Sequence, residues 1–275
     1  MAGFAIIKMS AVESKPLIRW AGSKRKLLPE LLARVPDSYE RYIEPFCGSA
    51  CLFFELGAPK AILSDINDEL INAYKQLKKQ PDIRDVLAAI PANEETYYRY
   101  RDLDPENLER AERAVRFFYL NRYCFNGIYR TNSSGKFNVP MGNRTGGFPC
   151  QSTFENARKK LLKARLLTSD YKKILDQVKK GDFVYMDPPY SKSEKFTGEY
   201  GVGSFNGSKL PEFLLDLRAI DAKGAKFLFS YRACKDTADQ LAQDFNVERV
   251  RVMRHISGFK TEWNEVEEIL VRNFD

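Results

Sequence analysis

The stretch YERYIEPFCGSACLFFELGAPKAILSD, residues 39–65, decides the fold class. Residues 39–46 are typical of a buried strand, residues 49–56 of a helix that follows a glycine-containing turn, and residues 59–65 of a second apolar strand. Residues 66–77 then place apolar side chains at helical spacing. This order of strand, helix, strand and helix begins a doubly wound, mostly parallel sheet with helices on its faces. The sequence therefore predicts an α/β fold.

The alternation of strands and helices stops near residue 80 and resumes near residue 164. Between these points helical segments are separated by loops, including a long stretch rich in Gly, Asn and Ser at 125–149. The chain then returns to the alternation, with strands predicted at 164–170, 182–187 and 225–231 and a helix at 171–180, and ends with two closing strands. We therefore expect one α/β domain that is interrupted by an insertion. The predicted divisions are a flexible leader at 1–15, an α/β domain at 16–79 and 164–275, and a mainly helical domain at 80–163.

The positive charge of the chain is concentrated in its middle. The net charge is +7 and the isoelectric point is about 9.0. Residues 98–166 hold 14 Lys and Arg against 6 Asp and Glu, so the rest of the chain is close to neutral. A basic segment of this kind favours a polyanionic partner, and it places the contact with that partner in the insertion.

The composition argues against several kinds of site. The five cysteines are scattered without a Cys-x-x-Cys pair and there is one histidine, which together disfavour a zinc site or a histidine relay. We expect a reduced, cytoplasmic protein that holds no metal. No run approaches the roughly 18 apolar residues of a membrane span, and MAGFAIIKMS lacks the features of a signal peptide, so no membrane contact is expected.

Polar residues at the predicted strand ends suggest a ligand site. Gly48 lies in a strand-to-helix turn, where backbone amides can approach a ligand, and Asp65 ends the next strand 17 residues later, a spacing typical of ribose binding. Asp170 and Asp187 end two further strands, and such ends meet at one edge of the sheet. The loop has neither a G-x-G-x-x-G motif nor a P-loop motif for binding phosphates. The sequence therefore favours a ligand that has a ribose and an adenine but no phosphates. A plain turn at Gly48 and a helix cap at Asp65 are the structural alternatives.

The segment GDFVYMDPPY, residues 181–190, stops an apolar strand with two prolines. Prolines fix φ and cannot donate a hydrogen bond, so they end the strand and hold the following backbone still. The Asp187 carboxylate and the Pro188 carbonyl are then rigid acceptors, and Tyr190 adds a flat ring. This arrangement suits a planar group that bears an NH2, whereas the alternative is a strand-ending turn with a capping aspartate.

Five motifs in order resemble the Dam-type DNA adenine-N6 methyltransferases. They are RWAGSKRKLLPEL at 19–31, EPFCGSA at 44–50, LSDIND at 63–68, NRYCFNGIYR with GKFNVPMG at 121–142, and DPPY at 187–190. The resemblance runs from about residue 16 to residue 273. It implies a Rossmann-like methyltransferase sheet, mostly parallel with an antiparallel closing strand, interrupted by a small helical target-recognition domain.

The resemblance also implies site residues. The cofactor would be S-adenosylmethionine, with Asp65 at the ribose hydroxyls and Asp170 at the adenine amine; its implied site comprises Trp20, Lys24, Pro45, Phe46, Gly48, Asp65, Asp170 and Asp187. The implied catalytic residues are Asp187, Pro188, Pro189 and Tyr190, and the implied DNA contacts are Asn126, Ile128, Tyr129, Arg130, Asn138 and Arg144. The sequence departs from the family at Arg19, at CGSA in the cofactor loop and at NRTGG after GKFNVPMG; the last bears on target specificity.

The predicted reaction is methyl transfer to N6 of an adenine in duplex DNA. The amine is a poor nucleophile, so the protein would contribute positioning and acceptors for the amine hydrogens, after the base has been flipped out of the duplex. The commonest family target is GATC, and a restriction-modification role is one setting. Alternatives are methylation of cytosine N4, RNA adenine or a protein amide, and a non-catalytic DNA-binding homologue. We expect a monomeric, bacterial or phage-encoded protein associated with the nucleoid.

Overall fold

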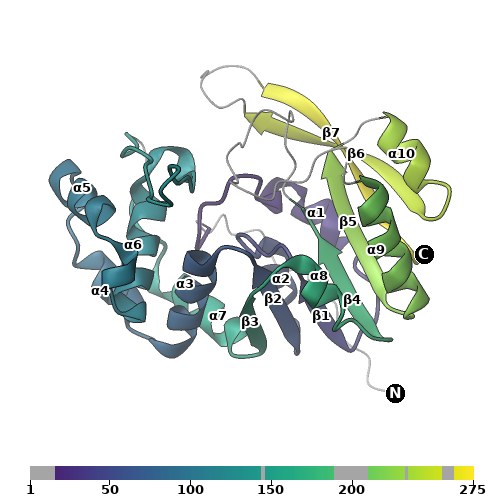
Figure 1. Ribbon diagram of the computed structural model, residues 1–275, viewed down its shortest axis with the longest axis horizontal. Coiled ribbons are helices and arrows are strands. Elements are labelled where there is room, and N and C mark those ends of the chain that lie inside the picture. Colours follow the sequence, from purple (N-terminus) through teal and green to yellow (C-terminus); the bar gives the residue numbers. More distant parts are fainter. Residues whose placement is uncertain (1–15, 144–145, 189–209, 233–234, 256–262) are drawn as a thin grey trace.

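The computed structural model describes residues 16–143, 146–188, 210–232, 235–255 and 263–275. Its centre is a seven-stranded sheet with the strand order β3-β2-β1-β4-β5-β7-β6 (Figure 1). The strands are β1 (Arg41–Glu44), β2 (Ala61–Asp65), β3 (Ala164–Thr168), β4 (Asp182–Met186), β5 (Lys226–Arg232), β6 (Asn246–His255) and β7 (Trp263–Arg272). Strands β1 to β5 pair in parallel, and β7 runs antiparallel to both β5 and β6. The predicted Rossmann-like sheet with one antiparallel closing strand is confirmed.

The helices follow the predicted order, with one clear difference in length. The helices of the α/β part are α1 (Leu28–Leu32), α2 (Cys51–Leu56), α3 (Asp68–Lys79), α7 (Gln151–Leu161), α8 (Tyr171–Leu175), α9 (Leu210–Ala222) and α10 (Lys235–Leu241), with a 3₁₀ turn η1 (Lys24–Leu27). The prediction of a helix over 171–180 was too long, since α8 ends at Leu175. The chain turns there, buries Val178 and reaches β4, whose first residue, Asp182, accepts a hydrogen bond from the Lys179 amide at 2.9 Å.

The sheet is buried on both faces, as a parallel sheet between helices requires. Along β4, Phe183 and Tyr185 belong to one apolar cluster and Val184 and Met186 to another, and every residue of the strand is buried. Alternate side chains of a strand point to opposite faces, so the two clusters lie on the two sides of the sheet. The strand ends, where apolar residues give way to Asp and Pro, are therefore the places at which this sheet can present polar groups.

Besides α7, which packs against α3 and β3 of the α/β part, residues 80–163 contribute α4 (Ile83–Ala88), α5 (Glu94–Asp102) and α6 (Arg110–Tyr123), together with the 3₁₀ turns η2 (Pro105–Asn107) and η3 (Phe125–Gly127). Helices α4, α5 and α6 gather beyond α3 at one end of the molecule, and β6 and β7 lie at the other (Figure 1). After α6 the chain forms a short hairpin, here called the 130–138 hairpin, in which the Asn138 amide donates to the Arg130 carbonyl at 3.1 Å. Part of the stretch 125–149, which was predicted only as a loop, therefore forms a hairpin.

Helix α6 holds the segment that precedes η1. The Asn121 side chain accepts from the Arg19 amide at 2.9 Å and donates to the Arg19 carbonyl at 2.6 Å. The buried Arg122 guanidinium donates to the Pro16 carbonyl at 2.7 Å. At Gly127 (φ 67°) an added Cβ would lie 2.4 Å from the Arg19 Cβ, so only glycine permits this approach. The N-terminal part of the α/β fold is therefore attached to the insertion.

Candidate active site

Residues 44–50 (EPFCGSA), here called the cofactor loop after their predicted role, are shaped by close contacts around Gly48. Its φ of 45° is left-handed, and an added Cβ would lie 2.8 Å from Cδ1 of the half-buried Trp20. The Gly48 carbonyl accepts a hydrogen bond from the buried Tyr74 hydroxyl at 2.8 Å. Pro45 is buried, and the ring of Phe46 lies 4.9 Å from that of Tyr171. The structure therefore brings Trp20 and the loop together at the end of β1.

Asp65, at the end of β2, reaches the same loop. Its carboxylate accepts hydrogen bonds from the Gly48 amide and from the Asn67 amide, both at 3.0 Å. Burial raises the pKa of Asp65, against the lowering effect of the hydrogen bonds from Asn67 and Gly48. The cap of α3 is Asn67, whose side chain accepts from the Leu70 amide, so Asp65 is not the residue that caps this helix.

Asp170 lies just beyond β3, the neighbour of β2 in the sheet. Asp65 and Thr168 are partners in the β2–β3 register, so Asp170 follows within two residues of the strand end beside Asp65. Its exposed side chain caps α8 by accepting from the Lys172 amide at 2.9 Å. The structure thus places Asp65 and Asp170 at the same edge of the sheet, with a capping role already visible for Asp170.

Asp187 follows β4 and sits in a network of buried polar groups. The Lys24 ammonium lies 3.0 Å from Asp187 Oδ1 and 3.3 Å from Glu268 Oε2. The Ser230 hydroxyl donates to Asp187 Oδ1 at 3.3 Å and lies 3.0 Å from the Tyr185 hydroxyl. Since the single Ser230 proton points to Asp187, Tyr185 is the donor of the second bond. Burial, and secondarily the charge of Asp187, raises the pKa of Tyr185 well above its usual range, which keeps this donor protonated.

Glu44 is a buried acid at the end of β1, between the loop and Asp187. The Tyr42 hydroxyl donates to its Oε2 at 2.9 Å. Burial raises the pKa of Glu44 well above its usual range; the Tyr42 bond lowers it, and the charges of Asp187 and Asp65 raise it further. The Glu44 carboxyl therefore holds its proton more strongly than an exposed glutamate does.

The predicted DNA-contacting residues lie around the 130–138 hairpin. Arg130 is exposed, and its Nε donates to Asn138 Oδ1 at 2.8 Å. Asn126 is exposed in a left-handed conformation (φ 53°), and Ile128 is half-buried. Tyr129 stacks on Trp20 with ring centroids 5.9 Å apart, which ties the hairpin to the cofactor loop. Pro188 is buried after Asp187, whereas Pro189, Tyr190 and Arg144 lie outside the described residues.

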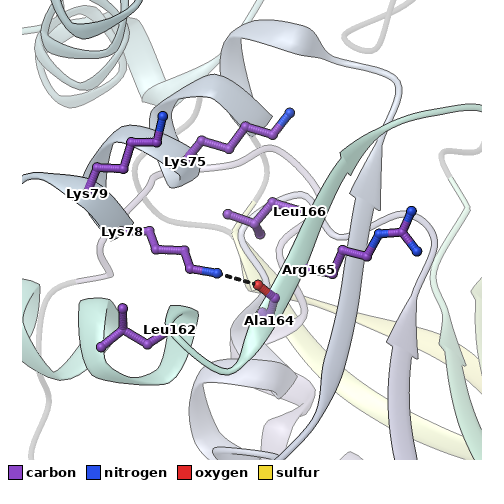
Figure 2. A pocket seen from close by; sticks show the side chains of 7 residues that line it. All are labelled: Lys75, Lys78, Lys79, Leu162, Ala164, Arg165 and Leu166. Carbon is purple, nitrogen blue, oxygen red and sulfur yellow. Dashed lines mark hydrogen bonds between the residues drawn. The ribbon is translucent and has the colours of Figure 1, made fainter.

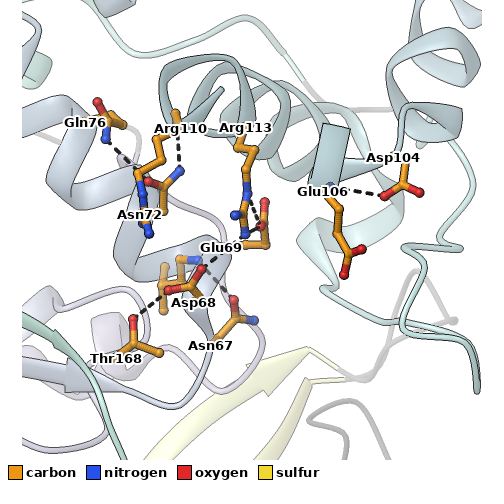
Figure 3. Close-up of polar contacts among 11 residues, drawn as sticks. Asn67, Asp68, Glu69, Asn72, Gln76, Asp104, Glu106, Arg110, Arg113 and Thr168 are labelled. Carbon is orange, nitrogen blue, oxygen red and sulfur yellow. Dashed lines mark hydrogen bonds and ion pairs between the residues drawn. The ribbon is translucent and has the colours of Figure 1, made fainter. Parts of the chain in front are cut away.

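Helices α3 and α6 are joined by polar contacts beside the cofactor loop (Figure 3). Arg113 of α6 donates from Nε to Glu69 Oε1 at 2.8 Å and pairs with Asp68 at 3.2 Å. The Asn72 side chain donates to the Arg110 carbonyl at 2.8 Å. Because Asp68 and Glu69 form the first turn of α3, directly after Asn67, the insertion contacts the same connection that carries Asp65.

A hollow of about 470 Å³ lies away from these strand ends, between the last turns of α3 and the start of β3 (Figure 2). It is lined by Lys75, Lys78, Lys79, Leu162, Ala164, Arg165 and Leu166. Ala164 lies six residues before Asp170, or about 20 Å at the rise of a strand. The Lys78 ammonium donates to the Ala164 carbonyl at 2.9 Å, as a charged residue that protects an edge strand does. The strand ends, and not this hollow, therefore remain the candidate site.

The comparisons with known proteins identify the family of the chain. Residues 20–256 match the family described as D12 class N6 adenine-specific DNA methyltransferase. The chain belongs to this family. The expected Dam-type resemblance and the adenine-specific DNA methyltransferase activity are thereby confirmed, and the substrate of the methyltransferase is DNA.

Relatives of the methyltransferase match along almost its whole length. The type II methyltransferase M1.LlaDCHI of Lactococcus lactis subsp. cremoris is 30% identical and covers 98% of this chain and 99% of its own. The type II methyltransferase M.MjaIII of Methanocaldococcus jannaschii is 30% identical and covers 96% of this chain and 100% of its own. The DNA adenine methylase of Haemophilus influenzae is 31% identical and covers 94% of this chain and 93% of its own.

Sequence reasoning did not single out several residues around Asp187 in the methyltransferase: Glu44, Tyr185, Ser230 and Glu268. One of them carries a signal in the sequence. Glu267 and Glu268 are adjacent in β7, so their side chains must point to opposite faces, and in a strand covered on one face one of them is buried. Glu268 is fully buried, whereas Glu267 pairs with Arg249 at the surface.

Two further observations concern the described part of the methyltransferase. No group of three or more His, Cys, Asp or Glu side chains there is arranged to hold a metal ion. None of the helices in those residues combines the length and the apolar character that crossing a bilayer requires.

Proposed function

We propose that this methyltransferase transfers a methyl group from S-adenosylmethionine to N6 of an adenine that is flipped out of duplex DNA, with Asp187 as the principal catalytic residue. The observation that carries the proposal is the position of Asp187: it follows β4 at the carboxyl end of the sheet, 20% exposed and held by Lys24 and Ser230. In open α/β sheets, ligands bind outside this end of the strands. The family supplies the reaction.

The cofactor would lie along the ends of β1, β2 and β3. Trp20, Pro45, Phe46 and Gly48 would form its apolar walls, and Asp65 would accept from its ribose hydroxyls. The residues fit such a group, because Gly48 gives the backbone a close approach and the Asp65 carboxylate is half-buried beside it. Asp170, exposed beside the end of β2, is the proposed acceptor for the adenine amine. When bound, S-adenosylmethionine supplies a methyl group activated by the positive charge of its sulfonium.

The chain would contribute positioning and acceptors to the transfer. The N6 lone pair would bond to the methyl carbon, the sulfur would keep the electron pair of the broken carbon–sulfur bond, and the proton that N6 loses would pass to solvent. The Asp187 carboxylate and the Pro188 carbonyl accept from the amine hydrogens, which favours the pyramidal nitrogen of the transition state. Pro189 completes the rigid turn and Tyr190 stacks on the flipped base.

The insertion would hold the duplex. Residues 80–163 form the proposed target-recognition domain, residues 16–79 and 164–275 the catalytic domain, and residues 1–15 a leader. Arg130 and Asn138 would reach base edges, Ile128 and Tyr129 would lie against the displaced base, and Asn126 and Arg144 would contact the backbone or bases. The first target to test is GATC. We further propose a monomer in the bacterial or phage-infected cell, with or without a restriction partner.

The test is a methyl-transfer assay on duplexes that contain or lack GATC, followed by nucleoside analysis of the product. N6-methyladenine in the GATC duplex alone would support the proposal, and sequencing of DNA methylated by the enzyme would give the target if it differs. N4-methylcytosine, or methylation of RNA in preference to DNA, would overturn it. Asp187→Asn, which keeps the shape of the side chain, should abolish the product while calorimetry still detects cofactor binding.

A further inference from the structure

Asn121, near the end of α6, holds the backbone of Arg19 by two hydrogen bonds. Its Oδ1 accepts from the Arg19 amide at 2.9 Å, and its Nδ2 donates to the Arg19 carbonyl at 2.6 Å. This pair fixes the orientation of the side-chain amide, because a flipped amide would set donor against donor and acceptor against acceptor. Asn121 is only 4% exposed, so a duplex cannot reach it, although it belongs to a motif associated with DNA contact.

The segment before η1 has further contacts with the same helix. The Arg19 guanidinium donates to the Arg122 carbonyl at 2.9 Å, and the Arg122 guanidinium donates to the Pro16 carbonyl at 2.7 Å. Among these contacts, those of Asn121 are made with both backbone groups of the residue directly before Trp20. Asn121 is therefore the side chain of the insertion that most directly determines where Trp20 begins.

Trp20 in turn lies against the cofactor loop. Its Cδ1 is so close to Gly48 that a Cβ added there would lie 2.8 Å away. The Trp20 carbonyl accepts a hydrogen bond from the Ser23 amide at 3.1 Å, and the Ser23 hydroxyl lies 2.9 Å from the Ser49 hydroxyl in the loop. The backbone of Trp20 is thus held by the insertion on one side and by contacts with the cofactor loop on the other.

We propose that Asn121 is a positioning residue for cofactor binding, which fixes Arg19 and so holds Trp20 against the cofactor loop. This inference rests on the proposed function, which makes Trp20 a wall of the cofactor site. Without the two hydrogen bonds of Asn121, Trp20 occupies this place in only a fraction of the molecules. The apparent dissociation constant for the cofactor then rises by the inverse of that fraction. The insertion therefore completes the cofactor site, in addition to its proposed contact with the duplex.

The experiment measures S-adenosylmethionine binding to the full chain by calorimetry without DNA, where a residue that contacts only DNA has no effect. Asn121→Leu keeps the approximate volume but loses both hydrogen bonds, so the cofactor should bind about tenfold more weakly. The matched control is Asn72→Leu. Asn72 is equally buried and donates from α3 to the Arg110 carbonyl of α6 at 2.8 Å, but it does not hold the backbone before Trp20. This control should lose stability and keep near wild-type cofactor affinity.

The position of the ring can be followed directly. The chain has two tryptophans, so Trp20 is the only one in a Trp263→Phe background. Quenching of its fluorescence by acrylamide should increase when Asn121→Leu is added, and saturation with S-adenosylmethionine should reduce the quenching again. Unchanged quenching in Asn121→Leu would contradict the inference.

Asn121→Asp gives a pH-dependent form of the test that does not require the leucine variant to fold. A protonated carboxyl accepts from the Arg19 amide and donates to its carbonyl, as asparagine does, whereas a carboxylate can only accept. Cofactor affinity relative to the wild type at the same pH should therefore recover as the pH falls.

The outcomes separate this inference from the proposed function. The inference is overturned if Asn121→Leu binds the cofactor as well as Asn72→Leu does while Trp20→Ala binds it weakly. It is also overturned if the relative affinity of Asn121→Asp does not change with pH. In both cases the proposed function stands, whereas a wild type that does not bind S-adenosylmethionine would overturn both.

Discussion

The strand ends and the 130–138 hairpin both present polar side chains, but they hold them in opposite ways. At the strand ends, Asp65 and Asp187 are fixed by backbone amides, by Ser230 and by Lys24. In the hairpin, the exposed Arg130 has Asn138 as its hydrogen-bond partner, a contact that water or a base can replace. Groups that stabilise a transition state gain from being fixed in advance, whereas groups that read a sequence must exchange partners on binding. Under the proposed function, the chain would therefore build its chemistry into the sheet and its recognition into an exposed turn.

Asp187→Ala is the variant with the largest expected effect, and it tests the fixed groups at the strand ends. We expect methyl transfer to fall by at least about 10²–10³-fold, because the variant removes an acceptor that acts at the transition state. DNA affinity should stay near that of the wild type, because the insertion makes the proposed DNA contacts. Single-turnover methylation together with duplex binding checks both parts, and a near wild-type rate would reject Asp187 as the catalytic acceptor.

Asp65→Ala should weaken S-adenosylmethionine binding. A carboxylate that accepts from two ribose hydroxyls contributes about 1.5–3 kcal/mol for each bond. Because Asp65 also accepts from the Gly48 and Asn67 amides, part of the loss reflects the loop itself. Asp65→Asn keeps one acceptor for those amides, so it should lose less affinity for S-adenosylmethionine than Asp65→Ala does. Unchanged cofactor affinity in Asp65→Ala, measured by calorimetry, would show that Asp65 serves only the loop.

Arg130→Ala tests whether the exposed 130–138 hairpin reads the DNA sequence. If Arg130 reads a base, the cognate duplex should lose about 1–3 kcal/mol of binding free energy and an unrelated duplex little. If it contacts only phosphate, both duplexes should lose affinity equally and the salt dependence should become shallower by about one unit. Binding to both duplexes at several salt concentrations separates these outcomes. The control is Arg218→Ala, because Arg218 lies on α9 and forms a surface ion pair with Asp244.

Glu44→Gln should give the smallest effect, on the pH dependence of stability. Burial raises the pKa of Glu44, so the folded protein keeps a proton that the unfolded chain loses above about pH 4.3. The stability from this group is complete below that pH and is lost as the pH rises towards the raised pKa. Glu44→Gln should therefore flatten the decline of Tm as the pH rises above about 4.3. The exposed Glu40→Gln is the control, and an unchanged slope in Glu44→Gln would contradict the assignment.

Much of the sheet could be predicted from the sequence, because its signals are local. Apolar runs predicted β1 to β5 in order, and Pro188 and Pro189 marked the end of β4. The insertion of β7 between β5 and β6 could not be predicted, since strand order depends on contacts between distant segments.

The candidate site was predictable only where a motif marks it. Asp65 and Asp187 stand at strand ends that the sequence marks. The pairing of Lys24 with Asp187 and Glu268 has no such mark, because these three residues lie far apart in the sequence. Asn121 and Arg122, in a motif associated with DNA contact, instead hold residues 16–19. Their type alone does not distinguish a buried polar contact from a phosphate contact, because the same amide and guanidinium groups serve both.

The position of β7 also has a consequence for the order of folding. Strand β6 pairs with β7 from Asn246–Arg272 to His255–Trp263, so these strands form a local hairpin that can assemble in about 1–10 μs. The pairing of β1 with β4 joins residues about 140 positions apart and is intrinsically slower. The hairpin docks on β5 through β7, and only this docking brings Glu268 to Lys24. We expect hydrogen exchange during refolding to protect the β6–β7 hairpin first and the amides around Asp187 last.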